Sequence, residues 1–315
     1  MSINELRDKH GRHIHKLRIS LLDACNMRCL YCMPEKQVFM PNKDWPKADE
    51  LIYMATNLVK QGIDEIRLTG GEPLLRADFM EIVHGLDKLP LKKFGFTTNA
   101  IHLKKHLKEL KKTNCQYINI SLDSVNRENF HKITKTDSLE VVLEAILMAK
   151  ELGFKVKLNT VLLRGMNDHE IIDLIDFAED NDIEIRFLEL MKIGVVLPVF
   201  DKLFISAEEV INKVKTKWSL ESVEMPVDST SFNFKTNSGG NIGFIASESR
   251  PFCGGCSRLR LGADGKLRPC LMLDDGPSLR GLEPDQFYPF LLKVMDLKPH
   301  TRINELIQPM HQVGG

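Results

Sequence analysis

Three cysteines near the N-terminus, Cys25, Cys29 and Cys32, follow an apolar run with the spacing C-x3-C-x2-C. We call them the first cysteine group. Thiolates this close together can direct their sulfurs at one inorganic centre. A zinc or iron–sulfur site with four thiolates needs one more ligand, and the next cysteine along the chain is Cys115. Three thiolates on a [4Fe–4S] cluster would leave one iron free, so the spacing favours a metal centre that contacts its substrate.

A second group of cysteines lies near the C-terminus, with the spacing C-x2-C-x13-C. Its members, the second cysteine group below, are Cys253, Cys256 and Cys270. We expect a second metal centre here; a structural zinc site with His300 or His311 as fourth ligand is the alternative. The remaining Cys115 is expected to be a buried structural thiol. Because six of the seven cysteines form two tight groups, the chain is expected in a reducing cytoplasm.

The composition excludes some classes of function. Lys and Arg number 43, as do Asp and Glu, so the net charge is zero and nucleic acid is not expected as a partner. The basic run at residues 104–112 has the helical spacing of a solvated face. The N-terminus lacks the apolar stretch of a signal peptide, and no segment approaches the roughly 20 apolar residues of a membrane span. We therefore expect no membrane association.

Short β-branched runs alternate six times with helical patterns, and these elements must position the cysteines. The predicted strands cover residues 17–22, 65–69, 93–98, 117–122, 155–163 and 184–190. Apolar spacing predicts helices around residues 51–58, 139–146 and 171–178. The last two begin at the capping-box pairs Asp137 with Glu140 and Asn167 with Glu170. Repeated β–α units predict an α/β fold, a partial (β/α)6 barrel of the TIM type.

Beyond about residue 200 the pattern changes. A helix over residues 206–217 begins at a capping box of Ser206 with Glu209. Short strands at 231–236, 241–246, 258–261 and 266–270 predict antiparallel hairpins. We therefore expect two domains. The barrel covers residues 1–200, and an α+β extension over residues 201–315 carries the second cysteine group and substrate-binding residues.

Polar or glycine-rich residues follow every predicted barrel strand. They are the first cysteine group, Gly70 to Pro73, Thr97 to Asn99, Ser121 to Asp123, Asn159, and Glu189 to Met191. The carboxyl ends of parallel strands meet at one rim, which forms the site in such folds. The sequence therefore predicts a single active site at this rim.

The order of these motifs resembles the radical S-adenosylmethionine (SAM) superfamily, which combines C-x3-C-x2-C with a GGEP turn. The wider set of motifs resembles one family within it, the GTP 3′,8-cyclases of molybdenum cofactor biosynthesis. That set is LRIS, YCMP, IRLTGGEPLLR, TTN, SLDS, KLNTVLLRGMND, RFLELM, the C-x2-C-x13-C spacing and a terminal Gly-Gly. The resemblance runs from about Leu17 to Gly315.

This resemblance implies two [4Fe–4S] clusters. The first cysteine group would hold the cluster whose open iron binds the amino and carboxylate groups of SAM, which is cleaved to methionine and a 5′-deoxyadenosyl radical. The second group would hold a cluster that faces the purine of GTP. Positions that match SAM contacts are Tyr31, Gly71, Glu72, Ser121 and Met191.

Seven further positions match GTP contacts of the family: Arg18, Arg67, Thr97, Lys157, Arg186, Arg258 and Arg260. Arginine suits bidentate phosphate contacts, and Arg258 and Arg260 alternate on one predicted strand, so both should face the same side. Gly314 and Gly315 match a tail that reaches into the barrel and is needed for catalysis. In the implied reaction the C3′ hydrogen of GTP is abstracted and the C3′ radical attacks C8, giving (8S)-3′,8-cyclo-7,8-dihydroguanosine 5′-triphosphate.

The implied partners are GTP, an electron donor of the flavodoxin or ferredoxin type and the next enzyme of the pterin pathway, and a homodimer is possible. The sequence departs from the family pattern at Ala24, Glu65 and Ala100 and has a less basic tail. Two alternatives stay open. One is a divergent radical SAM enzyme that acts on another substrate, such as a peptide. The other is a non-catalytic iron–sulfur or zinc scaffold or sensor.

Overall fold

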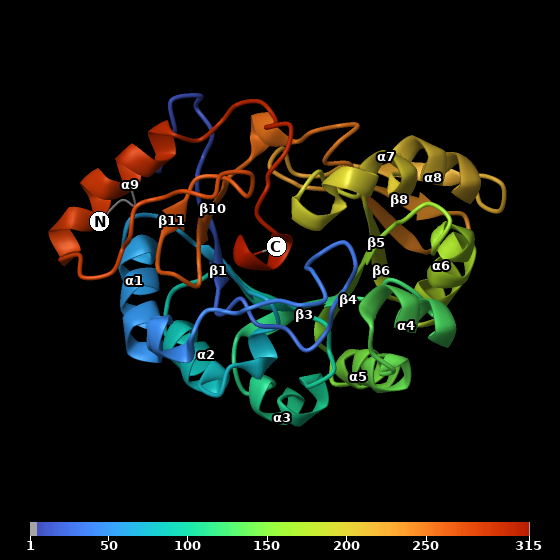
Figure 1. Ribbon diagram of the computed structural model, residues 1–315, viewed down its shortest axis with the longest axis horizontal. Coiled ribbons are helices and arrows are strands. Elements are labelled where there is room, and N and C mark those ends of the chain that lie inside the picture. Colours follow the sequence, from blue (N-terminus) through green and yellow to red (C-terminus); the bar gives the residue numbers. More distant parts are fainter. Residues whose placement is uncertain (1–4, 315) are drawn as a thin grey trace.

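The computed structural model describes residues 5–314, so residues 1–4 and Gly315 lie outside the described chain. Over these residues the strands form one eleven-stranded sheet in the order β11-β10-β1-β2-β3-β4-β5-β6-β9-β8-β7. The first six strands are β1 Lys16–Ser20, β2 Glu65–Thr69, β3 Lys93–Thr98, β4 Cys115–Ser121, β5 Lys155–Val161 and β6 Glu184–Leu188. All of their pairings are parallel. The sheet curves into the predicted partial barrel (Figure 1).

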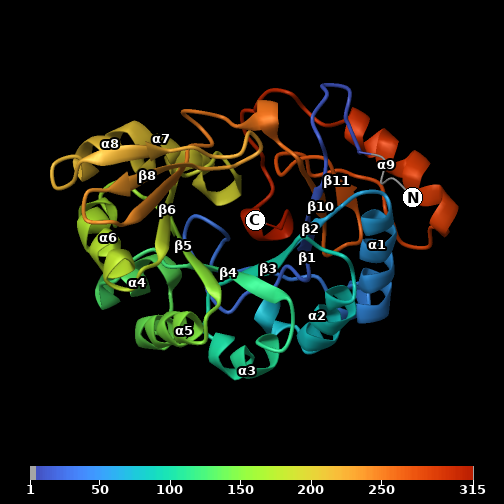
Figure 2. The same ribbon diagram turned by 180° about the vertical axis from the view of Figure 1, so that it is seen from behind.

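Helices cover the outer face of this sheet (Figures 1 and 2). They are α1 Ala48–Lys60, α2 Phe79–Asp87, α3 Leu107–Leu110, α4 Arg127–Thr134, α5 Leu139–Glu151, α6 Ile171–Asp180, α7 Phe200–Leu203, α8 Ala207–Val214 and α9 Phe287–Asp296. In α1 the apolar stripe is fully buried, as its period predicts. Burial of each such side chain contributes about 1.5–3 kcal/mol. Cys115, at the start of β4, is buried as expected.

The C-terminal strands extend the same sheet at both of its edges. They are β7 Leu220–Val223, β8 Phe232–Thr236, β9 Asn241–Ile245, β10 Arg258–Leu261 and β11 Leu267–Arg268. β10 pairs with β1 and β9 pairs with β6, both in parallel. Antiparallel pairing then adds β11 to β10, β8 to β9 and β7 to β8, which confirms the predicted hairpins. The second cysteine group thus lies beside β10, next to the first barrel strand.

Two of the predicted capping boxes are wrong. Helix α5 begins after Ser138 with no side-chain cap, and Asp137 pairs with Arg127 instead. At α6, Asn167 accepts from the Leu163 backbone and donates to the carbonyl of Asp123 after β4, and Glu170 accepts a hydrogen bond from Ser124. These side chains therefore bond groups away from the helix N-termini. The box of Ser206 with Glu209 is confirmed.

Among residues 5–314, no helix has the length and apolar character needed to cross a membrane.

Candidate active site

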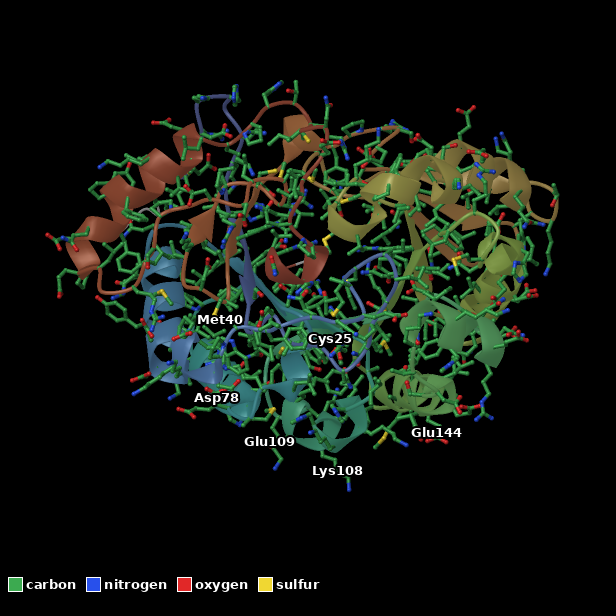
Figure 3. The ribbon with its side chains drawn as sticks, in the orientation of Figure 1. Cys25, Met40, Asp78, Lys108, Glu109 and Glu144 are labelled. Carbon is green, nitrogen blue, oxygen red and sulfur yellow. The ribbon has the colours of Figure 1, made fainter. Side chains whose placement is uncertain are left out.

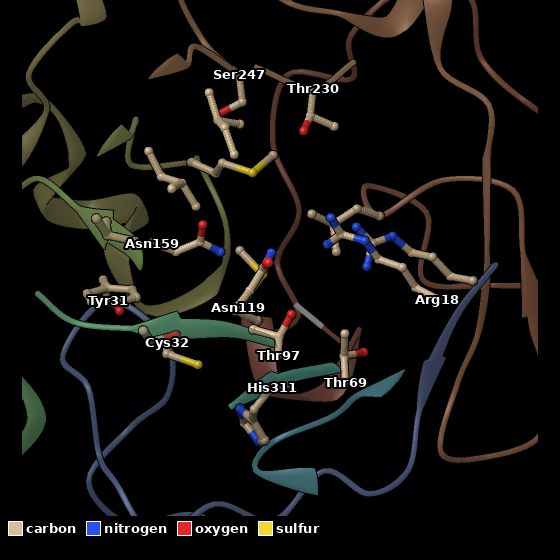
Figure 4. A pocket seen from close by; sticks show the side chains of 18 of the residues that line it. Arg18, Tyr31, Cys32, Thr69, Thr97, Asn119, Asn159, Thr230, Ser247 and His311 are labelled. Carbon is tan, nitrogen blue, oxygen red and sulfur yellow. The ribbon is translucent and has the colours of Figure 1, made fainter. Parts of the chain in front are cut away.

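The carboxyl ends of the barrel strands open into one cavity of about 340 Å³. Both cysteine groups line it, together with residues from β1, the GGEP turn and the ends of β3 to β6. Figure 3 shows Cys25 near the middle of the barrel, and Figure 4 shows Tyr31 and Cys32 on one side of the cavity and Arg18 on the other. The single site predicted from the strand ends is therefore the cavity that the fold forms.

The loop that carries the first cysteine group is held in place by polar contacts. Arg28 donates to the carbonyl of Cys25 at 2.6 Å, and the Tyr31 hydroxyl donates to Asp123 at 2.7 Å. Burial raises the pKa of Cys25 to about 11 and that of Cys32 to about 12. These thiols are therefore protonated without a metal, and metal binding would release their protons.

The GGEP turn lies directly against this loop. A Cβ atom at Gly71 would lie 2.1 Å from the carbonyl oxygen of Ala24, so only glycine fits there. Glu72 is buried, and its carboxylate accepts hydrogen bonds from the Thr98 hydroxyl and the Asn99 backbone, both at 2.7 Å. Burial nevertheless raises the pKa of Glu72 to about 7. A nearby cation would stabilise its ionised form.

Within the second cysteine group, Cys256 has the opposite electrostatic environment. Arg258 and Lys298 each donate to the sulfur of Cys256 at 3.4 Å. Burial opposes ionisation of Cys256, but the charges of Arg258 and Lys298 lower its pKa to about 6. A thiolate is therefore available for metal at neutral pH.

Three arginines stand side by side on adjacent strands. The parallel register places Arg18 of β1 opposite both Arg67 of β2 and Arg260 of β10. Burial, followed by the charges of Arg260, Arg258 and Arg67, holds the pKa of Arg18 well below its usual value. In the described chain, buried arginines such as Arg76 have carboxylate partners, but Arg18, Arg67, Arg258 and Arg260 have none within 4.0 Å. Such a group favours binding of a polyanion.

Most predicted site residues line the cavity. Those lining it are both cysteine groups, Tyr31, Gly71, Glu72, Ser121, Met191, Arg18, Thr97, Arg186, Arg258 and Arg260. Arg67 and Lys157 do not line it. Arg67, in register with Arg18, donates to the carbonyl of Phe96, and Lys157 pairs with Glu184 at 2.6 Å. The Gly314 carbonyl accepts a 2.7 Å hydrogen bond from Arg260, and Gly315 lies outside the described residues.

The family departures have simple structural consequences. Glu65 lies 4.0 Å from Lys16, at the base of the barrel rather than in the cavity. Ala100 is buried with φ of +64°, a conformation that strains an L-residue. Ala24 supplies the carbonyl that the GGEP turn approaches and accepts a hydrogen bond from the Glu72 backbone at 2.8 Å.

Sequence reasoning missed several residues that line the cavity. Lys298 comes from the C-terminal segment and belongs to no motif, and His311 was considered only as a zinc ligand. Asn159 was noted only as a polar strand end. In the described chain its side-chain oxygen is buried without a partner, as are both ring nitrogens of His311. Their hydrogen-bonding capacity is available to a bound molecule.

Cysteine thiolates are the usual protein ligands of iron–sulfur clusters. Each cysteine group offers three thiols to one cavity that also has free polar atoms for SAM. The fold, the cysteine loop and the GGEP turn define a radical SAM enzyme.

Comparisons with known proteins agree. The profile described as Radical SAM superfamily matches residues 19–178, and Molybdenum Cofactor Synthesis C matches residues 183–286. Curated relatives named GTP 3′,8-cyclase include one from Synechocystis sp., 45% identical over 98% of this chain and 95% of its own length. Another, from Aquifex aeolicus, is 40% identical over 87% of each chain. The chain belongs to the GTP 3′,8-cyclase family of radical SAM enzymes.

A search of solved structures agrees at the level of the fold. Streptococcus suis SuiB bound to S-adenosylmethionine superimposes with a TM-score of 0.65 at 16% identity, over 91% of this chain and 69% of SuiB. SuiB bound to precursor peptide SuiA gives a TM-score of 0.63 at 17% identity. At these identities the likeness concerns the fold alone.

Proposed function

We propose that the chain converts GTP to (8S)-3′,8-cyclo-7,8-dihydroguanosine 5′-triphosphate, an early step of molybdenum cofactor biosynthesis. The observation that carries this proposal is the arrangement of one cavity. Its lining includes the first cysteine group and the GGEP turn, the second cysteine group, and the unpaired cations Arg18, Arg258 and Arg260. A radical-generating centre and a polyanion site are both needed to act on GTP.

On the SAM side, the chain supplies a cluster loop and a carboxylate. The first cysteine group would hold a [4Fe–4S] cluster, which when bound would supply the electron for cleavage of SAM to methionine and a 5′-deoxyadenosyl radical. Glu72 offers its carboxylate to the methionine ammonium, and the tight approach of Gly71 to Ala24 fixes its position. Tyr31, Ser121 and Met191, on the cavity wall, enclose SAM. Asn159 adds an acceptor of hydrogen bonds.

On the substrate side, the chain supplies cations. Arg18, Arg258 and Arg260 bind the triphosphate, which relieves their mutual repulsion. Thr97 on β3 and Arg186 on β6 also contact the nucleotide. Arg67, in register with Arg18, and Lys157, which pairs with Glu184, add positive charge that attracts the same phosphates.

The second cysteine group would hold a second [4Fe–4S] cluster, which would anchor the purine of GTP. The low pKa of the Cys256 thiol and the position of all three cysteines on the cavity wall support this assignment. The C-terminal Gly-Gly tail, of which Gly314 lies against Ser20, completes the active site. We further expect that a flavodoxin- or ferredoxin-type protein donates electrons and that the product passes to the next enzyme of the pterin pathway. The barrel at 1–200 and the extension at 201–315 would be two functional regions, and the chain could form a homodimer.

Iron analysis tests the cluster content. Anaerobic reconstitution should give about eight irons and eight sulfides per chain. A content of about four irons per chain would indicate that only the first cluster is present. A content of zinc alone would support the alternative of a non-catalytic scaffold or sensor.

Arg258→Ala tests the substrate. The variant should lose GTP-dependent turnover by roughly 100-fold or more, since a charged hydrogen-bonding group contributes about 3 kcal/mol to a bound anion. Its uncoupled SAM cleavage should stay near the wild-type rate. The control is Arg127→Ala, an exposed arginine on α4. Equal loss of both activities in Arg258→Ala would remove Arg258 from the substrate site, and peptide-dependent SAM cleavage would favour the alternative substrate class.

A further inference from the structure

Lys298 is a buried lysine with no carboxylate partner in the described chain. It follows α9 and is 2% exposed. Its ammonium group has three hydrogen-bond donors, and all three are used. They bond the sulfur of Cys256 at 3.4 Å and the carbonyls of Arg258 at 2.6 Å and Pro269 at 2.8 Å.

These three acceptors hold the second cysteine group together. Cys256 is one of its members, Arg258 begins the strand after it, and Pro269 directly precedes Cys270. Lys298 therefore joins the two halves of the group, which are separated by the β10–β11 hairpin. The backbone carbonyls fix the ammonium group in place, so that its third proton is aimed at sulfur.

The chain around Lys298 is itself fixed from behind. Arg12 is 7% exposed and pairs with Asp8 at 2.6 Å. Its guanidinium group donates to the carbonyl of Cys253 at 2.7 Å and to that of Pro299 at 2.9 Å. Arg12 thus ties the segment that carries Lys298 to the first residue of the second cysteine group.

A buried ammonium ion is costly unless an anion lies nearby. The anionic groups acting on Lys298 are Cys256 and Cys270, and the adjacent Arg258 opposes its charge. Ionised sulfur is therefore the counter-charge that this lysine requires. Bound iron keeps both cysteines ionised permanently, so the cluster-loaded protein is the state that satisfies Lys298.

In the first cysteine group, no cation among residues 5–314 donates a hydrogen bond to the sulfur of Cys25. Its donors are the Met27 backbone at 3.4 Å and the Asn99 amide at 3.7 Å, both neutral, and the charge of Arg28 acts on it without such a bond. Carboxylates lie near this group, since the charges of Glu72 and Asp123 act on its thiols. The two groups therefore share a cavity but differ in electrostatic environment.

We infer that Lys298 is a positioning residue for the second cluster: its ammonium group holds Cys256 in place and raises the reduction potential of the cluster. Positive charge and hydrogen bonds to cysteine sulfur favour the reduced state. The second cluster is thereby the weaker reductant, which suits a centre that anchors substrate while the first centre cleaves SAM. The inference rests on the proposed second cluster.

The test measures the reduction potential of the second cluster alone. Full-length protein with Cys25, Cys29 and Cys32 replaced by alanine is reconstituted anaerobically and titrated with dithionite under EPR detection. Lys298→Met, which keeps the length of the side chain without its charge, should shift the midpoint to more negative potentials. Lys298→Arg should stay nearer to wild type. Lys293→Met, on the exposed face of α9, is the matched control and should not shift.

Iron content in the two-cluster protein is the second measurement. Loss of about four irons from Lys298→Met, with the first cluster retained, also supports the inference. An unchanged midpoint at full iron content would overturn it, as would equal loss of iron from both groups. Wild-type protein that takes up no second cluster would contradict the proposed second cluster itself. Failure of that proposal is thereby distinguished from failure of the role inferred for Lys298.

Discussion

Arg260 donates a 2.7 Å hydrogen bond to the carbonyl oxygen of Gly314, so a cation of the proposed triphosphate site also holds the C-terminal tail. Both groups are buried on the inner side of the sheet, and the described chain ends at the centre of the barrel in both views (Figures 1 and 2). A substrate phosphate that binds Arg260 must therefore share it with the tail or displace the tail. This couples substrate binding to the position of the tail.

Gly314→Ala should disrupt this coupling. Gly314 has φ of +72°, and a Cβ atom there would lie 2.8 Å from Cβ of Ser20. The strained backbone costs about 1–2 kcal/mol before the clash is counted, so we expect GTP-dependent turnover to fall roughly 10-fold or more. The measurement is steady-state formation of cyclised nucleotide.

Gly165→Ala is the matched control. Gly165 has nearly the same φ, +71°, but no atom lies within 4 Å of an added Cβ. It should retain wild-type turnover with a small loss of stability. Equal inhibition in the two variants would show that backbone strain alone, rather than the tail position, reduces activity.

SAM binding should release a proton near pH 6. Burial raises the pKa of Glu72 to about 7, so most ligand-free molecules carry a protonated carboxyl at pH 6. The methionine ammonium favours the carboxylate. Affinity for SAM should therefore rise with pH, by up to roughly tenfold per unit below pH 7, and level off above it.

Calorimetry of SAM binding in buffers with different ionisation enthalpies measures this proton. Glu72→Gln carries no titratable group and should bind SAM more weakly, with no proton release from this site. If the variant released as many protons as the wild type, Glu72 would not be the group that meets the ammonium.

Asp228 should stabilise the base of the barrel. It accepts hydrogen bonds from Lys16 at 2.5 Å, from Ser257 at 2.8 Å and from His15 at 2.9 Å. Although burial opposes ionisation, these bonds lower its pKa below the usual range. Its stabilisation is therefore present above about pH 4, the pKa of unfolded aspartate, and is lost as the pH falls through the folded pKa.

Asp228→Asn should lower the free energy of unfolding by about 1–3 kcal/mol at pH 7, with a smaller difference in acid. Urea denaturation at several pH values measures this difference. Asp180→Asn, at an exposed position of α6, should change the free energy by less than about 0.5 kcal/mol. A difference for Asp228→Asn that stays constant down to pH 3 would contradict the charge-based explanation.

Tyr31→Phe should loosen the loop of the first cysteine group. The Tyr31 hydroxyl donates to the buried Asp123 at 2.7 Å, and its removal leaves one carboxylate oxygen without that donor. We expect a loss of about 1–3 kcal/mol in the free energy of unfolding and less iron retained at the first group. Tyr288→Phe, on the exposed side of α9, should change neither quantity. Unchanged iron retention in Tyr31→Phe would assign the bond to folding alone.

The sequence predicted the features whose signals are local. The spacing of Cys25 to Cys32, the GGEP turn and the alternation of strands with helices each depend on short segments, and the structure places them as expected at one rim. Long-range features were not predictable. The pairing of β10 with β1 and of β9 with β6 joins segments that lie far apart in the sequence. No residue pattern in these strands indicates which of them will pair with the first or the last strand of the barrel.

The individual errors have the same origin. Lys298 has no motif, because its role arises only when the segment after α9 folds back onto Cys256. Glu170 was expected to cap a helix and instead binds Ser124 from another loop. In each case a tertiary contact decides the role of the side chain.

The most direct test of the account is formation of 5′-deoxyadenosine by the anaerobically reconstituted protein, given reductant and SAM, with and without GTP. We predict strong stimulation by GTP, with cyclised nucleotide appearing in step with 5′-deoxyadenosine. SAM cleavage that is indifferent to GTP would contradict the assignment of the cationic cavity to GTP.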